Sequence, residues 1–218
     1  MNWTQQVDGY CERLDPSFWA EPVNAITNLA FVIAALIMWQ RSAGLPLARL
    51  LSAILMAIGI GSFLFHTFAQ TWASMADTLP IVLFILTYIF AATRDYWGLS
   101  AAKSGFVTLL FFPYAALLVP AFGALPFFEI SAAYWPVPLL IFVYAFGLRR
   151  RIPRTARNLA IGAGVICLSL TFRSLDMPLC AQLPLGTHFM WHLLNGLALG
   201  WMIETYRVHM LAPPHKQG

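Results

Sequence analysis

The sequence predicts an all-α, polytopic membrane protein, a bundle of seven transmembrane helices with its N-terminus outside and its C-terminus in the cytoplasm. The first observation is composition: 60% of the 218 residues are hydrophobic and 10% are charged, whereas a soluble domain carries roughly 25% charged residues. The second is the number of apolar segments of nearly membrane length, and the third is the uneven distribution of the basic residues along the chain.

Seven apolar segments approach the length of about 20 residues that a membrane-spanning helix needs. They cover residues 23–40, 47–68, 73–93, 104–122, 127–148, 156–173 and 186–206. Several prolines interrupt or flank the fourth and fifth segments, which membrane helices tolerate when neighbours satisfy the freed backbone groups. We therefore expect an extracytoplasmic N-terminal segment at 1–22, one seven-helix domain at 23–207 and a short cytoplasmic tail at 208–218.

The basic residues fix the predicted orientation. Seven spans place the two termini on opposite sides, and of the 13 Lys and Arg residues only Arg13 and Arg173 then fall on the N-terminal side. Basic residues concentrate on the cytoplasmic side of membrane proteins. The run RRRIPRTAR is accordingly interpreted as a cytoplasmic anchor loop and not as a nucleic-acid site. The first residues lack a basic start and an apolar core, so no cleaved signal peptide is expected.

Five polar residues fall at one predicted depth. Ser62 and His66 are four residues apart at the outer end of the second span, and His188 and His192 are four apart in the first turns of the seventh. Asp77 lies about one turn into the third span, also from the outer side. Residues four apart share a helix face, and imidazoles within a membrane usually face the protein interior with a partner. We expect all five side chains to form one site near the outer surface.

Three histidines with one open coordination position are a typical catalytic zinc site. Zinc lowers the pKa of its bound water to about 7 and polarises a carbonyl. Asp77 is placed to accept the proton of that water, and Ser62 to hydrogen-bond an oxyanion or to hold the water. This chemistry cleaves an amide or an ester. Two other classes stay open: a haem-binding electron carrier that uses the histidine pair, and a transporter that uses Asp77 as a proton relay.

These residues also resemble a known family. The stretch GSFLFHTFAQTWASMAD, with THFMWH near the end and VDGYCERLDPSFWAEPVNAITNLAF near the start, is similar to the alkaline ceramidases. They belong to a superfamily of seven-span membrane hydrolases that also contains adiponectin-type receptors. The resemblance implies that His66, His188 and His192 bind zinc, with Asp77 and Ser62 catalytic. It implies hydrolysis of ceramide or a related N-acyl lipid to a fatty acid and a sphingoid base or amine. The alternative is a receptor-type or lipid-binding protein with a structural zinc.

Three further expectations follow, two of them from the resemblance. Calcium is expected near the N-terminus, bound by Asp8, the carbonyl of Tyr10, Glu12 and Glu21, because calcium prefers oxygen ligands. A disulfide is expected between Cys11 and Cys180, which would tie the N-terminal segment beside the seventh helix. The arginine-bearing loops indicate a bacterial inner membrane protein with the site toward the periplasm. Its partners would then be the lipid bilayer and an N-acyl lipid, which in bacteria need not be a ceramide.

Overall fold

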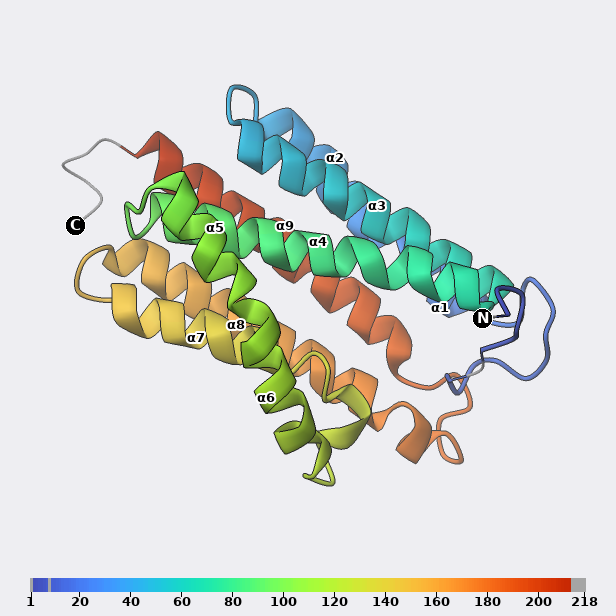
Figure 1. The fold of residues 1–218 in the computed structure, drawn as a ribbon. Coiled ribbons are helices and arrows are strands. Elements are labelled where there is room, and N and C mark those ends of the chain that lie inside the picture. The colour runs from blue at the N-terminus through green and yellow to red at the C-terminus, as the bar shows by residue number, and fades with distance from the viewer. Residues whose placement is uncertain (1, 8, 213–218) are drawn as a thin grey trace.

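The chain folds as an all-helical bundle. The computed structural model describes residues 2–7 and 9–212, and within these ranges the only β-pairing is an isolated bridge between Gln6 and Gln70. The long helices run side by side, and the N-terminal segment lies at the end of the bundle opposite to the end of the last helix (Figure 1). The all-α prediction is confirmed.

The first half of the chain forms three long antiparallel rods. Helices α1 (Pro22–Thr27) and α2 (Leu29–Arg41) follow each other with a break at Asn28, and together they make one apolar rod. Helices α3 (Pro46–Phe68) and α4 (Thr71–Asp95) follow. Proline stands in the first turn of α1 and of α3, where its missing N–H has no helical partner to lose.

The second half of the chain begins with two consecutive helices. Helices α5 (Ala101–Leu109) and α6 (Phe111–Gly123) cross the bundle obliquely and meet at Leu110. A 3-10 turn (Glu129–Ser131) leads into α7 (Pro136–Leu148), which is followed by α8 (Pro153–Leu175). A second 3-10 turn (Met177–Leu179) and a loop precede α9 (His188–Leu211), which runs beyond the predicted end at 207.

Five helical stretches of the described residues are long and apolar enough to cross a membrane: Pro22–Arg41, Pro46–Phe68, Thr71–Asp95, Ala101–Gly123 and Pro153–Leu175. Helix α9 has 24 residues, but histidines and other polar groups lower its hydropathy. The fifth predicted span, 127–148, is wrong in extent, because only its last 13 residues form an α-helix. These measure about 20 Å against a hydrocarbon core of about 30 Å. The count of seven spans and the orientation stay predictions.

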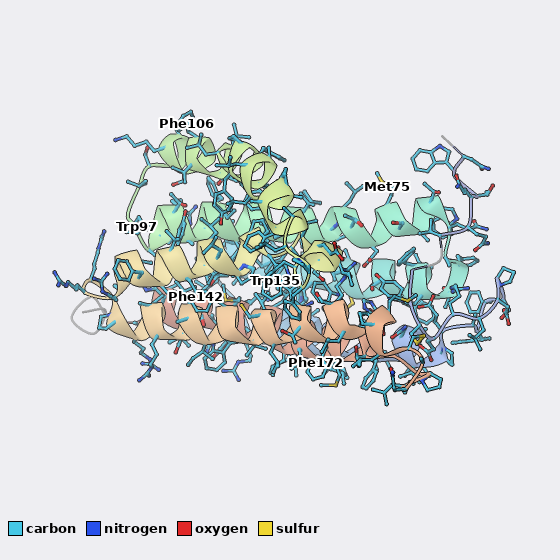
Figure 2. The ribbon with its side chains drawn as sticks, turned by 90° about the horizontal axis from the view of Figure 1, so that it is seen from below. Met75, Trp97, Phe106, Trp135, Phe142 and Phe172 are labelled. Carbon is cyan, nitrogen blue, oxygen red and sulfur yellow. A yellow bond between two sulfur atoms is a disulfide. The ribbon has the colours of Figure 1, made fainter. Side chains whose placement is uncertain are left out.

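Helix α9 lies between the α2–α3–α4 group and the α7–α8 pair, so its side chains are shielded on several sides (Figure 1). Trp135 points into the bundle and is 8% exposed, whereas Phe106 projects outward from α5 and is 64% exposed (Figure 2). Large apolar side chains on the outer face are what a hydrocarbon solvent permits. The first two turns of α9 carry two shielded polar groups, His188 and His192, at 1% and 0% exposure.

Gly61 sets the distance between α3 and α4 beside the two predicted catalytic residues. A Cβ atom at this position would overlap the backbone carbonyl oxygen of Ala76 and would lie 3.1 Å from the amide nitrogen of Asp77. Small residues let membrane helices approach closely. The atoms that this Cβ would overlap belong to the backbone of α4, which cannot give way as the end of a flexible side chain can.

We expect Gly61→Ala to lower the free energy of unfolding by about 1–3 kcal/mol, because the added methyl forces α3 and α4 apart. Gly164→Ala is the matched control, since a Cβ there meets no atom within 4 Å. Thermal unfolding in detergent should show a lower midpoint for the first variant and no decrease for the second. Equal midpoints for the two variants would show that this helix contact does not limit stability.

A candidate metal centre

The three predicted histidines come together at one end of the bundle. His66 lies in the last turn of α3, and His188 and His192 occupy the first two turns of α9. All three side chains are buried, at 1%, 1% and 0% exposure. Each offers a nitrogen atom within 4.8 Å of the other two, and the Nε2 atoms of His66 and His192 are 3.1 Å apart. The group could hold a metal ion.

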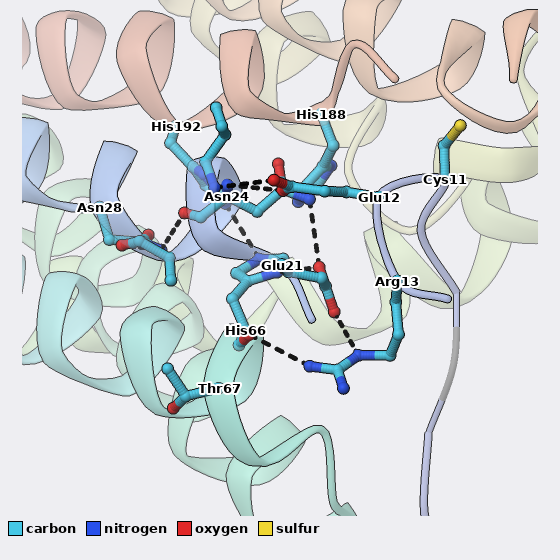
Figure 3. A network of polar contacts seen from close by, with 12 residues as sticks. Cys11, Glu12, Arg13, Glu21, Asn24, Asn28, His66, Thr67, His188 and His192 are labelled. Carbon is cyan, nitrogen blue, oxygen red and sulfur yellow. Dashed lines mark hydrogen bonds and ion pairs between the residues drawn. The ribbon is translucent and has the colours of Figure 1, made fainter. Parts of the chain in front are cut away.

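Neighbouring side chains fix the tautomers of two of these rings. Glu21 Oε2 lies 2.6 Å from His66 Nδ1, and a carboxylate can only accept at this point (Figure 3). Thr27 Oγ1 lies 2.9 Å from His192 Nδ1, while the same hydroxyl donates to the carbonyls of Val23 and Asn24. A hydroxyl has a single proton, so Thr27 must accept from His192. Both rings therefore carry their proton on Nδ1.

This assignment leaves two bare lone pairs facing each other across 3.1 Å, on Nε2 of His66 and of His192. Two lone pairs repel at that distance unless a metal cation or a shared proton lies between them. Ligands about 2.0–2.1 Å from a tetrahedral zinc are separated by about 3.3 Å, close to the spacing here. His188 Nδ1 is also buried and has no hydrogen-bond partner among the described residues. The residues fit a transition metal.

Glu21 and Thr27 form the outer layer of the centre. A metal-binding histidine usually donates its other N–H to a carboxylate or another acceptor, which fixes the ring. Burial alone would raise the pKa of Glu21, but the bonds from His66 and Arg13 outweigh it and hold that pKa below its usual range. The group is therefore a carboxylate. Sequence spacing gives no signal for either role, because 45 residues separate Glu21 from His66.

Ser62 and Asp77 line one cavity of about 60 Å³ beside the histidines, together with Trp191 and Asn195 of α9. The Ser62 hydroxyl interacts with the Asp77 carboxylate, and Asp77 also lies within electrostatic reach of His66. Asp77 is not one of the clustered ligands. Its carboxylate therefore lies at the edge of the centre, outside the group of clustered ligands.

The N-terminal segment covers the centre. The ring of Tyr10 stacks on His188 with the centroids 3.8 Å apart, and burial raises the pKa of this phenol. The predicted disulfide is confirmed: Cys11 and Cys180 are bonded, with their Cα atoms 5.5 Å apart. At its other end the segment pairs with the loop between α3 and α4, where Gln5 accepts from the amide of Thr71 at 3.0 Å. The segment is fastened on both sides of the histidines.

Asp176 holds the start of α9 in place. Its carboxylate accepts from the backbone amides of His188 at 2.8 Å, Thr187 at 2.7 Å and Cys11 at 2.9 Å. Arg173, three residues earlier in the chain, donates to the Ile130 carbonyl at 2.8 Å. A carboxylate at a helix N-terminus satisfies amides that lack helical partners.

The residues expected to bind calcium are already engaged. Glu12 accepts from the amides of Val23 and Asn24, both at 2.8 Å, and so caps α1. Burial raises the pKa of Glu12, although these amides oppose the effect. The Tyr10 carbonyl accepts from the Arg13 amide at 3.3 Å. Asp8, the fourth candidate, lies outside the described residues. Each described candidate therefore already accepts a hydrogen bond from the protein.

Fold and site together define a class: helical proteins of membrane-spanning length with a buried three-histidine group beside a cavity that contains a carboxylate. The sequence model of the family described as Ceramidase matches residues 9–217, which is nearly the whole chain. The chain belongs to the ceramidase family. Among curated proteins no sequence matches it.

Proposed function

We propose that the protein is a zinc-dependent amidase that works within the membrane and hydrolyses ceramide or a related N-acyl lipid to a fatty acid and a sphingoid base or amine. The observation that carries the proposal is the buried three-histidine group, in which the Nε2 atoms of His66 and His192 face each other across 3.1 Å with His188 alongside. Membership of the ceramidase family supports amide hydrolysis of a lipid.

The roles of the residues follow from their positions. A bound zinc would supply a Lewis acid for the attacking water and the amide carbonyl. Asp77 accepts a proton from the water and returns it to the leaving nitrogen as the C–N bond breaks. Ser62 shares the cavity with Asp77, and once Asp77 has taken up the proton the Ser62 hydroxyl turns to donate a hydrogen bond to the carbonyl oxygen as charge develops there. Glu21 and Thr27 keep two of the rings in the ligating tautomer.

The cavities indicate where the acyl chain lies. A second, almost wholly apolar cavity of about 60 Å³ adjoins the first, and the two share Ile85, Val137, Ile166 and Leu199 in their walls. The far end of the second cavity reaches Tyr88 and Tyr144. The polar end holds the amide and the apolar end takes the chain. Helix α6 buries no side chain, which leaves this flank suited to lateral entry from the bilayer.

The membrane arrangement is part of the proposal. Seven spans with the N-terminus outside would place the centre near the periplasmic face of a bacterial inner membrane. The supporting observations are the five membrane-length helices and the distribution of basic residues. Such a site draws its substrate from the outer leaflet of that membrane.

A substrate panel tests the proposed activity. Purified, zinc-loaded protein in lipid nanodiscs is incubated with a ceramide, an N-acylethanolamine, an N-acyl amino acid and a diacylglycerol ester, and free acid and amine are measured by mass spectrometry. We expect release from at least one N-acyl lipid and little from the ester. A protein that holds zinc but cleaves none of the amides would contradict the proposal and favour the receptor-type alternative.

A larger side chain in the wall that the two cavities share tests the acyl-chain assignment. We expect Ile85→Trp to lower kcat/KM for a long-chain substrate by roughly tenfold or more, and to spare a substrate with a short acyl group, because the indole fills the space for the distal chain. Leu83→Trp on the same helix is the control, since Leu83 is 54% exposed on the outer face. An equal loss of kcat/KM for the long-chain and the short-chain substrate would argue against this cavity as the acyl-chain site.

A further inference from the structure

A buried arginine lies at the centre of the N-terminal segment. Arg13 is 6% exposed, and its Nε donates to Glu21 Oε1 at 2.6 Å while Nη2 donates to the His66 carbonyl at 3.1 Å (Figure 3). Its Nη1 donates to the carbonyls of Asp15 at 3.1 Å and Ser17 at 3.3 Å. The guanidinium is thus surrounded by one carboxylate and three backbone carbonyls.

A cage of carboxylate and carbonyl oxygens is what a hard cation such as calcium prefers. In this chain the cage already holds a positive charge that is covalently part of the segment. The Glu21 carboxylate is shared between Arg13 and His66 at 2.6 Å each. Its oxygens have further lone pairs, but a divalent ion bound there would lie beside the guanidinium and be repelled by it.

We propose that Arg13 takes the place of a metal cation in the N-terminal segment, so that the segment binds no calcium and Arg13 acts as a positioning residue for the zinc centre. It neutralises Glu21 and holds this carboxylate against His66 Nδ1. It also joins the segment directly to the last turn of α3 through the His66 carbonyl. The inference rests on the proposed function only in taking His66 as a zinc ligand.

Calcium binding by the zinc-loaded wild-type protein is the first test. Thermal unfolding is measured with and without about 1 mM calcium, which suits even weak extracellular sites. Terbium, a luminescent stand-in for calcium, is titrated in parallel. We expect an unchanged midpoint and no saturable terbium signal. A saturable site that calcium displaces, and that Glu12→Gln or Glu21→Gln abolishes, would overturn the proposal.

The second test removes the charge. We expect Arg13→Gln to weaken zinc binding, measured by competition with a chelating dye, by about 10–100-fold, the range typical for partners of metal-binding histidines. Arg13→Lys should recover only part of this affinity, because a point charge cannot make the forked set of contacts. Arg41→Gln is the matched control: Arg41 also pairs with a glutamate, Glu204, at 2.7 Å, but its side chain is 52% exposed.

Zinc affinity separates a positioning role from a merely structural one. A variant that lowers the unfolding midpoint but binds zinc as tightly as wild type would overturn the assigned role, and so would equal effects of Arg13→Gln and Arg41→Gln. If Arg13→Gln fails to fold, the calcium and terbium titrations of the wild-type protein still test the claim that the segment binds no calcium. Neither readout uses hydrolysis, so inactivity toward N-acyl lipids would leave both tests intact.

Discussion

Replacing His66, His188 or His192 by alanine is expected to remove both the metal and the activity. Each substitution leaves two nitrogen ligands in a buried group whose three members lie within 4.8 Å of one another. Zinc sites in proteins usually use at least three protein ligands. Zinc content per chain should fall from one equivalent to a trace, and hydrolysis of the N-acyl lipid should fall to background.

His209→Ala is the matched control for these variants. His209 is also a buried histidine of α9, 7% exposed, but it lies at the opposite end of the helix and contacts Thr155 Oγ1 at 3.1 Å. This variant should keep its zinc and most of its turnover. Full zinc occupancy in any one of the three ligand variants would remove that histidine from the centre.

Asp77→Asn is expected to separate chemistry from metal binding. The substitution keeps the shape of the side chain but removes its ability to take up a proton at neutral pH. General acid–base catalysis contributes about 10²–10⁴-fold to rates, so kcat should fall by that factor. Zinc content should stay near that of wild type, because Asp77 is outside the ligand group.

Steady-state kinetics and metal analysis on the same preparation check this prediction. The KM for the lipid should change little, since Asp77 acts on the reacting atoms rather than on the acyl chain. Wild-type turnover by Asp77→Asn would exclude it as the proton acceptor. Loss of zinc together with loss of turnover would mean that Asp77 supports the metal and would leave the proton carrier to be found elsewhere.

Much of the fold could be predicted, because a long apolar run in a membrane protein indicates a helix. The predicted segments 47–68 and 73–93 correspond closely to α3 and α4. The breaks at Asn28 and Leu110 and the short α7 could not be predicted from apolar runs. Helix α7 begins at a proline, Pro136, whereas neither break stands at a proline, so an apolar run carries no signal for the two breaks.

The site was predicted only in part, for a similar reason. Histidines four residues apart on one helix leave a periodic signal, so His188 and His192 were found together. The partners that orient them lie far away in the chain: Glu21 is 45 residues from His66, and Thr27 is 165 residues from His192. The sequence gives no sign of a special role for Arg13, because its role depends on the oxygens that surround it after folding.

X-ray absorption at the zinc edge on purified, active protein tests the central claim most directly. The account predicts about one zinc per chain, with three imidazole nitrogens and one further light atom at about 2.0–2.1 Å and no sulfur ligand. A spectrum with sulfur neighbours or without the imidazole signature would contradict this assignment of ligands. Full hydrolytic activity in protein that contains no transition metal would contradict the mechanism itself.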